Sequence, residues 1–165
     1  MTRAIRVTPA RKFILAGVTL MCLTSCGLDS EGQATKAATD AVRSRAALAQ
    51  DTASAVLADP KRATQTPEQQ LTALATAASA ADRHGVVFGQ RTGQDGHLEV
   101  DVAYDEAGHG GGYIAAEVHV RLCVRLSGVA DKDPHVDIVD IACDPALDQR
   151  PNRPDQIVTF APVNR

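Results

Sequence analysis

Aromatic residues are scarce in this chain of 165 residues. It has no Trp, two Tyr and three Phe, and one of the Phe lies within the first 25 residues. Sugars and single-stranded bases are usually bound by stacking on aromatic rings. The four aromatic residues beyond residue 25 therefore make a stacking platform an unfavourable hypothesis.

Basic residues are also sparse after residue 25. The first 25 residues hold Arg3, Arg6, Arg11 and Lys12 and no acidic residue, so the remaining 140 residues have 13 Lys plus Arg against 20 Asp plus Glu, a formal net charge of −7. Nucleic acids and anionic lipid headgroups are both recognised by Lys/Arg footprints. We therefore expect no nucleic-acid partner and no membrane attachment through surface charge.

The longest apolar run near the N-terminus, residues 13–23, is too short for a permanent membrane span. Eleven helical residues reach about 17 Å, against a hydrocarbon core of about 30 Å. A basic segment, a short apolar segment and then small residues is the order found in a cleavable signal peptide. We therefore expect residues 1–25 to be removed.

The leader ends in Leu23-Thr24-Ser25-Cys26. This string resembles the lipobox of bacterial lipoproteins, whereas Cys22 follows the bulky Met21 and does not fit. The resemblance implies that Cys26 carries a diacylglyceryl group, becomes the mature N-terminus and anchors the protein at the extracytoplasmic face of the cell membrane. Two acyl chains form a durable anchor, because each buried CH₂ contributes about 0.8 kcal/mol. The alternatives are an unmodified Cys26 behind an ordinary secretory signal and an uncleaved leader.

Two other cysteines, Cys123 and Cys143, remain in the mature chain. An exported protein lies in a compartment that favours oxidation, so we expect one disulfide between them. The alternative, a pair of metal-binding thiolates, lacks a CxxC motif or a His at zinc spacing.

Two helices are expected after a short polar tether at residues 26–33. Residues 34–58 are rich in Ala with a thin apolar face, so this helix either packs on the domain or forms a solvated stalk. In the second helix, residues 67–84, Thr66 and Gln69 form a capping box, Pro67 occupies the first helical position and Gly85 supplies a C-cap. Leu71 and Leu74 lead the apolar face with which this helix should cover a sheet.

From residue 86 the hydrophobic period changes to two. Even-numbered apolar residues should form the core face, with turns at Gly93–Gly96 and Gly108–Gly112, a β-bulge between Ile138 and Val139, and a short last strand around Ile157. The even-numbered set is Val86, Phe88, Leu98, Val100, Val102, Tyr104, Ile114, Ala116, Val118, Val120, Leu122, Val124 and Leu126. The sequence therefore predicts one α+β domain over residues 34–165. Two N-terminal helices precede a four- to five-stranded antiparallel meander, which the second helix covers on one face. This order of elements is similar to cystatin-like and nuclear-transport-factor-like folds.

The odd-numbered, polar face of the sheet holds the candidate metal-binding residues. In the register that we expect, Glu99 faces His119 and Asp101 faces Glu117, so Glu99, Asp101, Glu117 and His119 would gather into one cluster able to bind a divalent cation. Alternating charge is also what any solvated strand face shows, and that interpretation is favoured.

No catalytic motif stands out. Gly108-His109-Gly110-Gly111-Gly112 contains the HGGG string that supplies oxyanion-hole amides in lipases, but the chain has no G-x-S-x-G nucleophile elbow. We therefore expect a non-enzymatic binding or accessory domain, without a cofactor, whose partner is a cell-envelope protein or a cell-wall component. A metal or small-solute capture module is the second hypothesis and a hydrolase is the third. The sequence does not indicate an oligomeric state.

Overall fold

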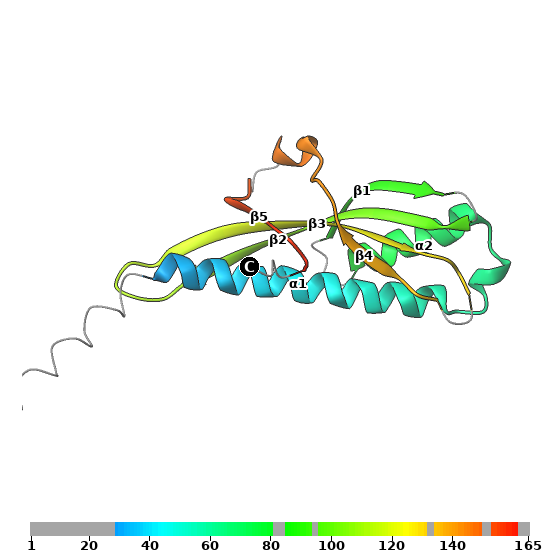
Figure 1. Cartoon of the computed structure of the whole chain (residues 1–165), viewed down its shortest axis with the longest axis horizontal. Helices are drawn as coiled ribbons and strands as arrows, with labels where there is room; N and C mark the ends of the chain where they lie inside the picture. Colours follow the sequence, from blue (N-terminus) through cyan, green and yellow to red (C-terminus); the bar gives the residue numbers. More distant parts are fainter. Residues whose placement is uncertain (1–28, 81–84, 94–95, 132–133, 150–152, 162–165) are drawn as a thin grey trace, which may run out of the picture.

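The computed structural model describes residues 29–80, 85–93, 96–131, 134–149 and 153–161. Two helices precede a five-stranded, mostly antiparallel sheet, which confirms the α+β class (Figure 1). The elements are α1 (Ser30–Leu57), η1 (Arg62–Thr64), α2 (Pro67–Ala80), β1 (Gly85–Thr92), β2 (Leu98–Gly110), β3 (Ala116–Gly128), β4 (Asp137–Asp140), η3 (Pro145–Gln149) and β5 (Gln156–Val158).

Four strands form an antiparallel meander in the order β1-β2-β3-β4. The last strand departs from the expectation of a purely antiparallel meander, because β5 pairs parallel with β3, Arg121 opposite Ile157. The strands β4 and β5 run in opposite directions and pair with different parts of β3, β4 with residues 124–127 and β5 with residues 120–122. The strand β4 pairs with β3 in one unbroken register, so the β-bulge expected between Ile138 and Val139 is wrong. Apolar residues change parity there because Ile138 packs on the main core and Ile141 on the opposite face of the sheet.

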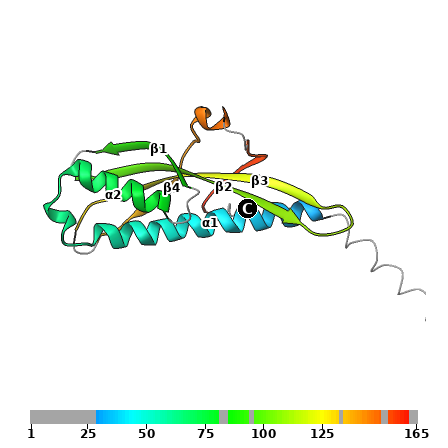
Figure 2. The ribbon, with the colours of Figure 1, turned by 180° about the vertical axis from the view of Figure 1, so that it is seen from behind.

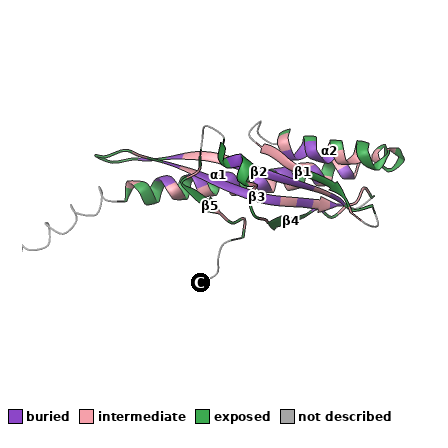
Figure 3. Cartoon of the chain, turned by 90° about the horizontal axis from the view of Figure 1, so that it is seen from above, coloured by how far each residue is buried: buried purple, intermediate pink, exposed green. Residues whose placement is uncertain are grey.

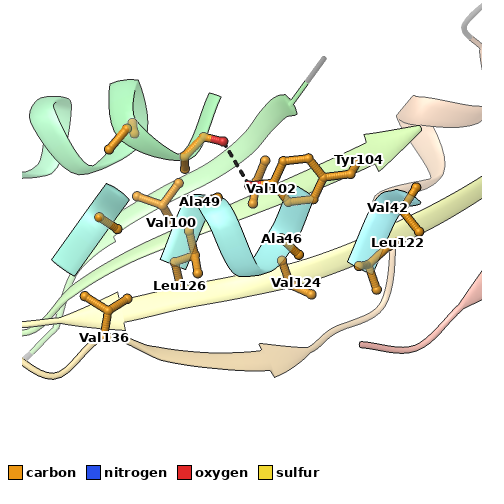
Figure 4. Packing of buried hydrophobic residues seen from close by; sticks show 14 of the residues in the cluster. Val42, Ala46, Ala49, Val100, Val102, Tyr104, Leu122, Val124, Leu126 and Val136 are labelled. Atoms are coloured by element: carbon orange, nitrogen blue, oxygen red, sulfur yellow. Dashed lines mark hydrogen bonds between the residues drawn. The ribbon is translucent and has the colours of Figure 1, made fainter. Parts of the chain in front are cut away.

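The long hairpin of β2 and β3 carries most of the core. Its even-numbered residues from Leu98 to Tyr104 and from Val118 to Leu126 are buried in one cluster, which confirms the predicted parity (Figure 4). The prediction fails for Val86 and Phe88, which pack on the other face. The cause is the pairing of Val86 with Ala103, followed by a register shift between Val87 and Gly89 that leaves Phe88 without a strand partner. It fails also for Ile114, which lies in the turn and is exposed.

Helix α1 packs along the sheet and is not a stalk. Its 28 residues span about 42 Å, nearly the length of the 13-residue strands β2 and β3 at about 3.3 Å per residue. One face of the helix is buried against the sheet (Figures 1 and 4): Ala34, Ala38, Val42, Ala46, Ala49, Ala53 and Leu57. The helix begins at Ser30, so residues 30–33, expected in the tether, are helical.

Small residues bring α1 unusually close to the sheet. A Cβ at Gly108 would lie 1.9 Å from the carbonyl oxygen of Ala34, and one at Gly110 would lie 1.7 Å from that of Ser30. Both glycines belong to β2, so the turn expected at Gly108–Gly112 begins later, at Gly111. The glycines are needed because the helix backbone occupies the space that a side chain would fill.

Helix α2 covers the sheet beside α1, next to β1. The predicted capping box is present, with the Thr66 N–H donating to Oε1 of Gln69 (3.2 Å) and the Gln69 N–H donating to Oγ1 of Thr66 (3.4 Å). The Tyr104 hydroxyl donates to the Ala78 carbonyl (2.9 Å), which ties the helix to β2 (Figure 4). Gly85 is not a C-cap but the first residue of β1, where a Cβ would lie 2.9 Å from the Ala78 carbonyl oxygen. The expectation that the second helix alone covers the sheet is therefore corrected, because both helices share that face.

Candidate functional site

The face of the sheet opposite α1, called here the outer face, carries the charged residues singled out in the sequence. At its centre Asp101 lies directly across from Arg125 on β3. Arg125 donates from Nε to Oδ1 (2.7 Å) and from Nη2 to Oδ2 (3.2 Å), and Nη1 of Arg91 donates to Oδ2 (3.2 Å). Glu99 completes the group by pairing with Arg91 and, at 3.6 Å, with Nε of Arg125. Two carboxylates and two guanidinium groups thus neutralise each other.

The absence of a side chain at Gly89 leaves space for this ionic group. A Cβ at Gly89, which pairs with Asp101, would lie 2.8 Å from Oδ2 of Asp101. Burial alone would raise the pKa of Asp101, but the hydrogen bonds and charge of Arg125, together with Arg91, outweigh burial and lower this pKa below its usual value. The same pair raises the pKa of Arg125 through its hydrogen bond to Asp101. The carboxylate is therefore held in its charged form.

Because the pKa of Asp101 is lowered, the substitution Asp101→Asn should change the free energy of unfolding by an amount that depends on pH. A lowered folded-state pKa contributes stability that is present above the unfolded-state pKa of about 3.9 and is lost as the pH falls through the folded value. At pH 7 the substitution should lower the free energy of unfolding by about 1–3 kcal/mol, as expected for a charged hydrogen-bonded group. The difference from the wild type should shrink below about pH 4. Urea unfolding at pH 7, 5, 4 and 3 would check this, and a difference that is constant with pH would contradict it.

A second ionic group on the outer face centres on Arg121, which is completely buried. Its Nε and Nη2 donate to Oδ1 and Oδ2 of Asp105 (2.6 and 3.1 Å), and its Nη1 donates to Oδ1 of Asp148 (3.1 Å). Asp148 belongs to η3, which rises on the side of the sheet opposite α1 (Figure 2). A buried arginine is costly unless it is paired, so this bidentate contact explains how it is tolerated.

Between the two ionic groups lies a small apolar cluster beneath η3. The predicted disulfide joins Cys123 to Cys143, with their Cα atoms 5.4 Å apart, on the outer face as expected. Leu147 of η3 covers Ala103 and Cys123, and partly buried residues surround them: Val86, Phe88, Ile141 and Cys143. No periodic pattern in the sequence predicts this cover, because Leu147 is the one large apolar residue of a mostly polar segment.

The predicted pairing of the four metal-binding candidates is wrong. Glu99 lies opposite Ser127, and His119 lies opposite Ala107. Residues 99 and 107 are eight positions apart on β2, about 26 Å at 3.3 Å per residue, too far to share one cation. Glu117 and His119 instead form their own pair, with Oε1 to Nε2 at 3.3 Å, and both are substantially exposed. Among the residues that the structure describes, no three His, Cys, Asp or Glu are placed to hold a metal ion.

The backbone of His119 has a structural role. Its N–H donates to Oδ2 of Asp155 (2.9 Å), and its carbonyl accepts from the N–H of Asp155 (2.8 Å). These two bonds hold the chain at the start of β5 against β3.

The HGGG string, residues 109–112, covers the end of β2 and the start of the turn after it. Gly110 lies within β2, as does Gly108 just before the string, and the backbone of α1 fills the space in front of both. An oxyanion hole needs amide groups aimed at a space that a substrate can enter. These glycines serve packing instead.

An open hollow lies between the two helices, on the side away from the ionic groups. It has a volume of about 440 Å³ and is lined by both helices and by Arg62 of η1, with Thr52, Val56, Thr72, Thr76 and Ala80 among its walls.

Within the described ranges, no helix is long and apolar enough to cross a bilayer. No family model, no curated protein and no solved structure matches the chain. The likeness in element order to cystatin-like and nuclear-transport-factor-like folds stays a prediction.

Proposed function

We propose that the mature protein is a lipoprotein anchored through acylated Cys26 at the extracytoplasmic face of a bacterial membrane, where it presents a non-enzymatic binding or accessory domain. The Leu23-Thr24-Ser25-Cys26 string carries this proposal. These residues lie outside the described part of the chain, so the support comes from the sequence.

The disulfide supports an exported location. Cys123 and Cys143 are joined beneath η3, and structural disulfides of this kind persist in oxidising compartments outside the cytoplasm. The remaining mature cysteine, Cys26, is then the one left for lipid.

The ionic groups of the outer face favour a binding or accessory role over catalysis or cation capture. Asp101 accepts from both Arg125 and Arg91, and Asp105 is bridged by Arg121. A catalytic carboxylate or a cation ligand needs a free oxygen aimed at a substrate or an ion, whereas these oxygens are engaged with guanidinium groups. The arrangement rigidifies the sheet as a framework. The domain would then act through its surface on a cell-envelope protein or a cell-wall component.

The anchor is tested by Cys26→Ser. This substitution removes the only thiol that the lipobox offers, so incorporation of a labelled fatty acid should fall to background and the protein should leave the membrane fraction. Cys22→Ser is the matched control and should keep both the label and the membrane location. Equal labelling of Cys26→Ser and the wild type would refute the anchor.

A further inference from the structure

The turn between β2 and β3, residues 111–115, exposes two large apolar side chains. Tyr113 is 101% exposed and Ile114 is 71% exposed, more than any other large hydrophobic residue described. The tip of this hairpin appears in Figure 3 as an exposed projection beyond the buried part of the sheet. Two adjacent large apolar side chains that are exposed at a projecting tip indicate a contact site for an apolar partner.

The tip lies at the end of the molecule where α1 begins. Figures 1 and 2 show the hairpin turn beside the N-terminus of α1 from both sides. The contact is direct, because a Cβ at Gly110 would lie 1.7 Å from the carbonyl oxygen of Ser30. The position of the tip relative to the start of the helix is therefore fixed by backbone packing.

Only four residue steps separate Cys26 from Ser30. A fully extended chain covers at most about 14 Å in four steps. If Cys26 carries the lipid, as proposed above, the start of α1 and the hairpin tip beside it are held within this distance of the membrane surface.

We propose that the hairpin tip is a second membrane contact, in which Tyr113 and Ile114 insert into the interfacial zone of the bilayer that holds the Cys26 lipid. Tyrosine suits this zone because its ring is apolar and its hydroxyl reaches water, and isoleucine suits the acyl chains just below. The neighbours Gly111, Gly112 and Ala115 are small and allow close approach. Glu31 in the first turn of α1 and Glu117 on β3 are acidic, so attraction to anionic headgroups is not expected and the contact would be apolar.

Two attachment points would set the orientation of the domain. The lipid alone would attach the domain to the membrane at one point and would not set its orientation. With the tip also inserted, the membrane would meet the end of the molecule where α1 begins, and the other end of α1, about 42 Å away by helical rise, would face outward. The hollow between α1 and α2 lies toward that outward end.

The absence of Trp from the chain offers a clean probe. In the full-length protein purified in its membrane-anchored form, Tyr113→Trp introduces a single indole at a site where nothing packs against it. The variant is reconstituted into phosphatidylcholine vesicles with or without bromine on the acyl chains. Insertion by about 5–10 Å would place the indole among the upper acyl carbons, so a blue-shifted emission and quenching by the brominated lipid are expected. Ile114→Trp should behave in the same way.

Val139→Trp is the matched control, because Val139 is also an exposed apolar residue but lies on β4, away from the hairpin tip. Its emission should be the same with and without vesicles and should be unaffected by bromine. Intact mass reports the lipid on Cys26 separately. Lipidated protein that floats with vesicles while Tyr113→Trp and Ile114→Trp remain unquenched would overturn the hairpin contact and leave the anchor standing, and a protein partner would then be the better occupant. Protein without lipid on Cys26 would overturn both proposals.

Discussion

Replacing Gly108 by Ala should destabilise the domain by about 3 kcal/mol, at the upper end of what overpacking usually costs. The new methyl carbon would lie 1.9 Å from the carbonyl oxygen of Ala34 and 2.8 Å from its carbonyl carbon, where real Cβ contacts do not fall below 3.0 Å. The helix and the strand would have to separate by about 1 Å along a buried interface, which loosens the contacts of Ala38 and Val42 as well. Urea unfolding followed by circular dichroism would measure the loss.

Gly111→Ala is the matched control for this prediction. Gly111 is three residues away in the turn, and a Cβ there would meet no atom within 4 Å. Its effect should stay within about 0.5 kcal/mol, as for most surface substitutions. Gly110→Ala should fall between the two, because it meets Ser30 at the helix terminus, where the first turn can fray. Equal effects of Gly108→Ala and Gly111→Ala would show that the close approach of α1 does not stabilise the fold.

These glycines also show why the hairpin was predicted in the wrong place. A run of Gly in a sequence indicates a turn, because glycine adopts backbone conformations that other residues avoid. Gly112, with a φ of 139°, does occupy such a conformation. Gly108 and Gly110 are extended and owe their identity to a helix about 75 residues earlier in the chain, which no local pattern reveals.

The sequence predicts which residues of β2 and β3 lie on the core face of the sheet, but it does not predict which residues of the two strands pair with each other. The alternation of apolar residues from Leu98 to Leu126 places them on one face for any even shift of the pairing, so the core face was correct. The observed register places Glu99 opposite Ser127, eight residues beyond the predicted partner His119. The candidate cation cluster depended on register, and it therefore failed although the residues do lie on the expected face.

The sequence also leaves open whether α1 packs on the sheet or forms a solvated stalk. Alanine buries little area, so an Ala-rich face indicates only weak hydrophobic stabilisation of docking. What decides the matter is the complementary surface, since Gly108 and Gly110 let the backbone of α1 lie directly on β2. Small residues on both partners are individually ambiguous and become informative only once they are seen together.

Breaking the disulfide should produce the second large effect, a loss of about 3 kcal/mol from the 20-residue separation between Cys123 and Cys143. The bond ties the segment after β4 to the centre of β3, and the segment in turn carries Leu147 and Asp148 over the outer face. Without the bond, the contacts of Leu147 and Asp148 would have to offset more of the chain entropy that is lost when η3 is held over the outer face. Urea unfolding of the wild type with and without reductant should show the loss, and Cys143→Ala should match the reduced wild type.

The double variant Cys123→Ala/Cys143→Ala separates the bond from the buried sulfur atoms. If the crosslink is responsible, the double variant and Cys143→Ala should be about equally stable, and reductant should change neither. Intact mass after alkylation should show that both thiols of the wild type become reactive only after reduction. If alkylation modifies both cysteines in the untreated native protein, or if reduction leaves the unfolding midpoint unchanged, the crosslink does not stabilise the domain. The cover of the outer face would then rest on the packing of Leu147 and on the ion pair between Arg121 and Asp148.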